Sequence, residues 1–117
     1  YVVASEENPK EADFFEALVS AGIQLRSKPL LIYPGGLKKA DWDVGLTVDA
    51  IEMAPDVDVV VLASGDGDFL PLVISLQHTG KLVEAVAFGK TTNTKLREAV
   101  DYFYDLDQFA KKILLRK

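Results

Sequence analysis

The stretch VVVLASGDGDF, from Val59 to Phe69, decides the fold. Its apolar residues run without a break into Asp66 and Asp68, which alternate with glycines. Residues 57–64 are too uniformly apolar for a half-exposed strand, so they predict a central strand covered on both faces. The simplest interpretation of the acidic loop that follows is a turn in which one aspartate caps the next helix.

Strands and helices alternate along the rest of the chain. The expected strands lie at residues 1–5, 28–34, 57–64, 81–89 and 102–106. The expected helices lie at residues 6–22, 41–54, 69–80, 93–100 and 107–117, and residues 35–40 are expected to form a loop. This order predicts an α/β protein with a three-layer α/β/α, Rossmann-like fold and a mostly parallel sheet. Ligands of such sheets bind beyond the carboxyl ends of the strands, where the SGDGD loop falls.

Composition limits the class of protein. The 117 residues, 49% hydrophobic and 26% charged, suit one soluble domain, residues 1–117. The absence of cysteine excludes disulfides and thiolate metal sites. No apolar run approaches the roughly 20 residues of a membrane helix, so we expect no membrane association and a cytoplasmic setting. Because Tyr1 begins in what reads as the middle of a strand, we also expect that a first strand is missing from this sequence.

The net charge of −5, from 13 basic and 18 acidic residues, argues against a passive nucleic-acid coat. An acidic protein can still act on phosphates where cations mediate. The sequence leaves the oligomeric state open, including a homo-oligomer.

Asp43 is the anomalous residue of the helix at 41–54. With Val44 at zero and about 100° per residue, the apolar residues form one wide arc, and Asp43 falls inside it at about 260°. Asp49 lies beside the arc, at about 140°. A carboxylate on a core-facing arc must be paired, protonated or bound to a cation, since burying a lone charge costs several kcal/mol or more.

Asp43, Asp66 and Asp68 converge if the start of this helix lies near the end of the strand. Three carboxylates in one place favour a hard cation, and Mg²⁺ or Mn²⁺ suits them best. Zinc would want histidine or cysteine ligands, and we interpret the lone His78 as a surface residue. Mg²⁺ or Mn²⁺ held at a strand edge is suited to phosphoryl chemistry.

KADWDVGLTVDA, VVVLASGDGDFLPLV, GKLVEAVAFG and NTKLREAVDYFYDL together resemble the NYN domain, the LabA-like branch of the PIN-like nucleases. The resemblance covers Lys39 to Leu106 and implies a Rossmann-like fold with a divalent-metal ribonuclease site built from aspartates. Asp43, Asp66 and Asp68 match the family's acidic positions, and Ser64 matches the serine that shapes the loop. The family's first strand ends in a further aspartate that nothing before Tyr1 supplies here, so that strand was either left out of this sequence or lost, and we expect omission. Ala40 stands after Lys39 where the family often has glycine.

Several residues carry weaker predictions. Lys39 could reach a substrate phosphate, and Asn93 is expected to cap its helix and turn N–H groups toward an anion. Asp101 matches another acidic position of the family, although a helix-end cap is the alternative. Asp49 could support the site from behind or face solvent. Trp42 and the YFY aromatics at 102–104 could stack on bases, but we interpret most of them as core.

The sequence therefore predicts a metal-dependent ribonuclease. Asp43, Asp66 and Asp68 are the predicted catalytic and metal-binding residues, Lys39, Ser64 and Asn93 the predicted substrate-binding residues, and RNA the predicted substrate. The first alternative is an inactive RNA- or protein-binding module of the same fold. A flavodoxin- or receiver-like domain is a second, although SGDGDF lacks the phosphate-cradling pattern of the former.

Overall fold

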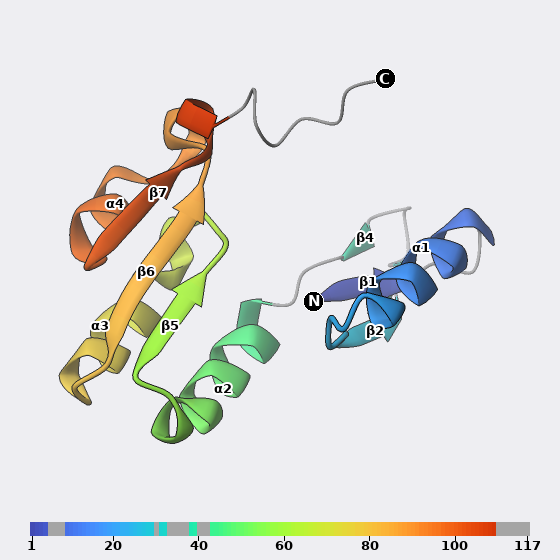
Figure 1. Cartoon of the computed structure of the whole chain (residues 1–117), viewed down its shortest axis with the longest axis horizontal. Coiled ribbons are helices and arrows are strands. Elements are labelled where there is room, and N and C mark those ends of the chain that lie inside the picture. The colour runs from blue at the N-terminus through green and yellow to red at the C-terminus, as the bar shows by residue number, and fades with distance from the viewer. Residues whose placement is uncertain (5–8, 30, 33–37, 40–42, 110–117) are drawn as a thin grey trace. The chain divides into compact units, whose positions relative to one another are not determined.

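Figure 1 shows a computed structural model of the chain, which describes residues 1–4, 9–29, 31–32, 38–39 and 43–109. The chain divides into two compact units, Tyr1–Leu46 and Thr47–Lys117. The expectation of a single domain stays a prediction.

The first unit begins with strand β1 (Val2–Ala4), helix α1 (Pro9–Ser20) and strand β2 (Ser27–Pro29). Strands β1 and β2 pair in parallel, as expected for strands joined by a helical crossover. Helix α1 confirms the helix predicted at residues 6–22. It ends where Gly22 adopts a φ of 90°, a conformation that glycine takes at little cost.

Two predictions for the first unit are wrong. The single strand expected at 28–34 is divided, because Ser27–Pro29 pairs with β1 whereas β3 (Leu31–Ile32) pairs antiparallel with β4. Strand β4 is Lys38–Lys39, which lies within the expected loop. Two-residue strands are defined by their partners, and no local sequence pattern marks them.

Helix α2 runs from Asp43 to Met53 and continues into the 3₁₀ turn η1 (Ala54–Asp56). The helix predicted at 41–54 is confirmed in this part, and its expected cap, Asp41, lies outside the described residues. The predicted core-facing arc is wrong in the structure as described: α2 has no buried residue, and Val44 is 77% exposed. Asp43 is half-buried, so its carboxylate does not carry the full cost of burial.

The second unit is built on a parallel sheet of β5 (Val59–Leu62), β6 (Leu82–Ala87) and β7 (Tyr102–Asp105), in that order. Helices α3 (Leu70–His78) and α4 (Thr94–Ala99) supply the crossovers (Figure 1). The α/β class with a parallel sheet is confirmed. Because the strands are parallel, all three carboxyl ends meet at one edge of the sheet.

The core of this unit lies between the sheet and helices α3 and α4. Along β6 every second residue is buried, which is the period expected of a strand with one covered face. Val73 and Leu96, from the two helices, are fully buried against that face together with Ala85. Pro71 lies in the first turn of α3, where its missing N–H breaks no hydrogen bond.

The opposite face of the sheet is open in this unit. Val61 is 57% exposed and Tyr102 is 56% exposed, while Tyr104 packs its ring 4.5 Å from that of Tyr102. The central strand among the described residues is β6, so the prediction of a central, doubly covered strand at 57–64 is wrong for this sheet. The interpretation of Tyr102 and Tyr104 as core residues is wrong as well, and Phe103 alone of the three is directed to the covered side, below Arg97.

The last predicted helix, 107–117, differs where it is described. Residues Leu106–Phe109 form the 3₁₀ turn η4, and the remainder lies outside the described residues. Among the helices that the structure describes, none has the length and apolarity needed to cross a membrane.

Candidate functional site

The loop after β5 is held by its own side chains. The Ser64 hydroxyl accepts a hydrogen bond of 3.1 Å from the backbone N–H of Asp66. The Asp66 carboxylate accepts one of 2.9 Å from the N–H of Asp68 and so caps the 3₁₀ turn η2 (Gly67–Phe69). The simple interpretation of an aspartate cap is therefore correct for Asp66, and Ser64 does shape the loop.

The two glycines of the loop allow a close approach to the loop after β6. A Cβ atom on Gly65 would lie 2.6 Å from the Thr92 Oγ1 and 3.0 Å from the Thr92 Cα. A Cβ atom on Gly67 would lie 2.6 Å from the Asn93 amide. Neither glycine needs a positive φ, so the requirement here is space and not backbone freedom.

Asn93 joins the two loops. Its backbone N–H donates a 2.9 Å hydrogen bond to the carbonyl of Gly65, and its side-chain oxygen accepts one of 3.1 Å from the N–H of Leu96. The prediction that Asn93 caps its helix is confirmed. The cap lies at the same sheet edge as the acidic loop.

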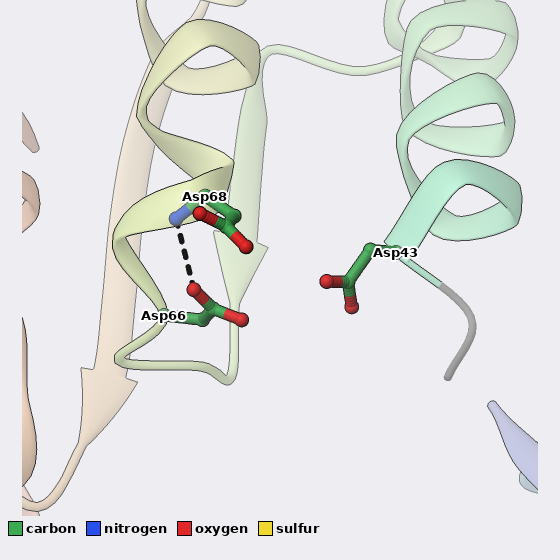
Figure 2. A group of neighbouring side chains, drawn as sticks. All are labelled: Asp43, Asp66 and Asp68. Atoms are coloured by element: carbon green, nitrogen blue, oxygen red, sulfur yellow. Dashed lines mark hydrogen bonds between the residues drawn. The ribbon is translucent and has the colours of Figure 1, made fainter. Parts of the chain in front are cut away.

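Asp43, Asp66 and Asp68 form the acidic cluster of this edge (Figure 2). Each offers one carboxylate oxygen, and these oxygens lie within 4.8 Å of one another. Asp43 is the first residue of α2. Helix α2 begins in the first unit, and its turns from Thr47 onward belong to the second unit, as does the acidic loop. Asp66 and Asp68 are exposed and Asp43 is half-buried, so the cluster is accessible from solvent.

The donor set fits a hard divalent cation. Three carboxylates at this spacing repel one another without a counter-charge, and oxygen ligands are those that Mg²⁺ and Mn²⁺ prefer. The negative charge of Asp43 in the first turn of α2 is also favourable toward the helix dipole.

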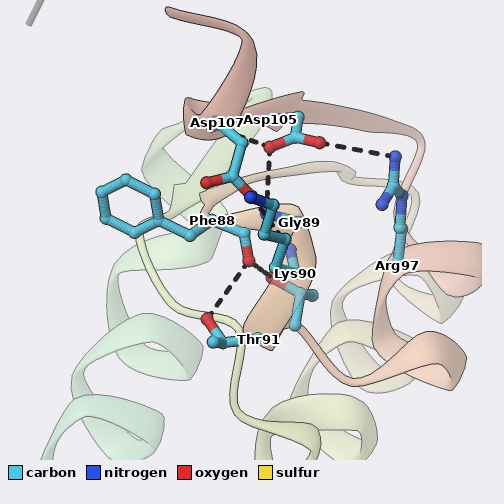
Figure 3. A network of polar contacts seen from close by, with 8 residues as sticks. Phe88, Gly89, Lys90, Thr91, Arg97, Asp105 and Asp107 are labelled. Carbon is cyan, nitrogen blue, oxygen red and sulfur yellow. Dashed lines mark hydrogen bonds and ion pairs between the residues drawn. The ribbon is translucent and has the colours of Figure 1, made fainter. Parts of the chain in front are cut away.

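A second polar network lies at the same edge, between the ends of β6 and β7 (Figure 3). The Asp105 carboxylate accepts hydrogen bonds from the N–H groups of Gly89 and Asp107, both 2.9 Å, and lies 3.8 Å from the Arg97 guanidinium. The Asp107 carboxylate accepts a hydrogen bond of 3.0 Å from the N–H of Lys90. The hydrogen bond from Gly89 is the main cause that lowers the pKa of Asp105.

This network fixes the 3₁₀ turn η3 (Gly89–Thr91) and was not predicted from the sequence. A Cβ atom on Gly89 would collide with the Asp105 carboxylate, so a larger residue there would displace that side chain and its hydrogen bonds. The network could have been predicted from the positions of two residues. Asp105 ends β7, and Gly89 follows β6, the strand that pairs with β7.

A cavity of about 490 Å³ lies between the ends of β5 and β6. Its wall includes the chain from Ala63 to Asp66, the segment from Val86 to Phe88, and Thr91 and Leu106. The cavity therefore shares Asp66 with the acidic cluster. It was also absent from the sequence predictions.

Other predicted residues lie elsewhere. Asp101 precedes β7 at the amino end of the sheet, where its carboxylate accepts hydrogen bonds from the Val83 N–H at 2.8 Å and the Gln77 amide at 3.2 Å. These bonds, with that from Val83 the stronger cause, lower the pKa of Asp101. Asp101 is thus a structural residue remote from the acidic loop, closer to the cap alternative than to a site role.

His78 is exposed at the end of α3, as predicted, and Asp49 is half-buried on α2. Lys39 lies in β4, where the backbone but not the side chain is described, and Trp42 lies outside the described residues.

The acidic cluster lies beyond the carboxyl ends of parallel strands, which is where α/β sheets of this kind bind their ligands. The family model of the NYN domain matches residues 1–107, and the chain belongs to this family.

Two curated proteins are similar to this chain. "Low amplitude and bright protein LabA" of Synechococcus elongatus is 29% identical over 100 residues, which cover 80% of this chain and 54% of that protein. "Uncharacterized protein MJ0482" of Methanocaldococcus jannaschii is 31% identical over 68 residues, which cover 56% of this chain and 28% of that protein. The chain thus spans about half the length of the first relative and less of the second.

A solved structure is also similar. The protein of unknown function VPA0982 from Vibrio parahaemolyticus is 42% identical and matches with a TM-score of 0.82, over 92% of this chain and 66% of that one. The LabA-like NYN resemblance read from the sequence is therefore confirmed.

Proposed function

We propose that the chain is a divalent-metal-dependent ribonuclease. Its proposed active site, which hydrolyses RNA phosphodiester bonds, is formed by Asp43, Asp66 and Asp68. The observation that carries the proposal is the approach of their three carboxylate oxygens to within 4.8 Å in a chain of the NYN family. Mg²⁺ or Mn²⁺ is the proposed cofactor. When bound, such an ion polarises the phosphate, lowers the pKa of water and stabilises the charge of the leaving oxygen.

The chain's own residues prepare this site. Asp66 uses one carboxylate oxygen to cap the turn that carries Asp68, so the two acids are fixed relative to each other. Ser64 holds the N–H of Asp66 and thereby the direction of the loop. In the proposal, Ser64 and Asn93 line the path of the RNA backbone at this edge, and Lys39 offers a positive charge to a phosphate.

A binding module without turnover is the second candidate. The net charge of −5, which provides little general attraction for RNA, is compatible with such a module. The two candidates differ in whether cation binding leads to cleavage.

The test combines Mn²⁺ titration by calorimetry with cleavage of end-labelled single-stranded RNA. The informative variant is Asp66→Asn, because an asparagine oxygen can still accept the Asp68 N–H and keep the loop while the charge is removed. The matched control is Asp58→Asn, an exposed acid before the amino end of β5.

We expect the unchanged chain and Asp58→Asn to bind Mn²⁺ and cleave RNA, and Asp66→Asn to lose both. Binding without cleavage in the unchanged chain would favour the module. Cleavage that survives in Asp66→Asn would contradict the proposed site.

A further inference from the structure

The cavity between the ends of β5 and β6 adjoins the acidic cluster through Asp66, which belongs to both. It is open toward solvent, and its volume of about 490 Å³ lies within the range of ligand pockets. A substrate whose phosphate lies at the cluster would bring its neighbouring nucleoside to this cavity.

The wall of the cavity suits a flat, neutral group. Alanine, valine, leucine and phenylalanine side chains supply most of the surface, among them Val86, Phe88 and Leu106. Among the described residues of the wall, Asp66 carries the only formal charge, and no lysine or arginine is present. A phosphate in this space would therefore meet no countercharge, whereas a nucleobase would bury its apolar faces.

Phe88 provides a stacking surface. The residue is 46% exposed, and Figure 3 shows its ring directed away from the hydrogen-bonded groups of the network. The backbone carbonyl of Phe88 accepts hydrogen bonds from the Thr91 hydroxyl at 3.3 Å and the Thr92 hydroxyl at 2.8 Å. The main chain that carries the ring is therefore held in place, while the ring itself is accessible.

Two hydroxyl groups of the wall each make one hydrogen bond within the loops. The Ser64 hydroxyl accepts from Asp66, and the Thr91 hydroxyl donates to Phe88. Stacking on an aromatic ring is tolerant of base identity, because every base has a flat π face.

We propose that this cavity binds one nucleobase of the RNA, stacked on Phe88, next to the phosphate that is cleaved, and that it does so with little preference among the bases. The proposal rests on the proposed ribonuclease function, because RNA is the substrate named there.

The first test measures binding without hydrolysis. A single-stranded oligouridine carrying one 2-aminopurine is titrated with the chain in EDTA, and the quenching of 2-aminopurine fluorescence reports stacking. The variants are Phe88→Ala, Phe88→Tyr, which keeps an aromatic ring, and the control Tyr102→Ala, which removes an exposed ring at the start of β7. Circular dichroism checks that each variant is folded.

Quenching is expected in the unchanged chain, in Phe88→Tyr and in Tyr102→Ala. In Phe88→Ala we expect the affinity to fall about 5- to 150-fold, the range for loss of one stacked base. An equal loss in Tyr102→Ala, or none in Phe88→Ala, would overturn the proposal.

The second test measures cleavage with Mn²⁺. An RNA with one abasic nucleotide, placed at each position in turn, should show a raised KM at one position beside the cut, and the four bases should be nearly equivalent there. Cleavage that is indifferent to every abasic position and to Phe88→Ala would overturn the base site while the nuclease stands. Quenching that depends on Phe88 without any cleavage would leave the base site and refute the nuclease.

Discussion

The backbone N–H of Asn93 donates a 2.9 Å hydrogen bond to the carbonyl oxygen of Gly65. This bond joins the acidic loop after β5 to the loop that leads into α4. Together with the close contact of Gly65 and Thr92, it makes the two loops one packed unit at the carboxyl edge of the sheet.

The contact at Gly65 predicts a stability defect. A methyl group there must displace Thr92, including its Cα atom at 3.0 Å, so Gly65→Ala should lower the free energy of unfolding by about 1–3 kcal/mol. Urea unfolding measures it. In the double variant with Thr92→Ala the closest contact, at Oγ1, is removed, and the two losses should be less than additive. Simple additivity would contradict the contact.

The cap at Asn93 predicts a second, separable effect. Asn93→Ala should cost about 1 kcal/mol of unfolding free energy, because the N–H of Leu96 loses its acceptor. Asn93→Asp keeps an acceptor oxygen and should retain most of the stability. The control is Lys95→Ala, an exposed position in the same helix, which should change little. A loss in Asn93→Asp as large as in Asn93→Ala would argue against the cap.

Asp101 should act on stability and not on the cation site. Asp101→Ala removes the acceptor for the Val83 N–H and for the Gln77 amide, so thermal unfolding should occur at a lower temperature. At temperatures where it is folded, the variant should bind Mn²⁺ as the unchanged chain does, because Asp101 lies at the amino end of the sheet and the acidic cluster lies at the carboxyl end. Weaker Mn²⁺ binding in a folded Asp101→Ala variant would place this residue in the site after all.

Asp105 should make stability depend on pH in the acid range. Its folded pKa lies below the ordinary value of 3.8, chiefly through the Gly89 N–H. The contribution to stability is therefore present above the unfolded pKa and is lost as the pH falls through the folded pKa. Urea unfolding across this range should give a flatter acid limb for Asp105→Asn than for the unchanged chain. An identical limb in both would contradict the assignment.

The sequence predicted the second unit more accurately than the first. Capping and turn residues such as Asn93 and Pro71 mark the helices locally, and the apolar runs at β5 and β6 mark the strands, so element type and order were found. The strand pairing of Lys38–Lys39 could not be found, because it depends on a partner and not on local preference.

Side-chain surroundings were less predictable than elements. The projection at about 100° per residue placed the apolar residues of α2 on one arc. Such an arc does not show what packs against it, and Val44 and Val48 are exposed. Asp66 and Asp68, which alone suit an ordinary turn, were predicted as site residues together with Asp43 on its apolar arc and with the resemblance to the NYN domain. Asp105 and Phe88 were not, since a lone acid and a lone aromatic residue at a strand end become informative only when their neighbours in the sheet are known.

Asp66 belongs both to the carboxylate cluster and to the cavity wall. An ion in the proposed site and a base in the proposed pocket would both lie against Asp66, whose carboxylate also accepts a 2.9 Å hydrogen bond from the N–H of Asp68. If a bound ion changes the affinity for a base by some factor, a bound base must change the affinity for the ion by the same factor. The affinity for Mn²⁺ measured with and without RNA would therefore report the coupling free energy between the two proposed sites.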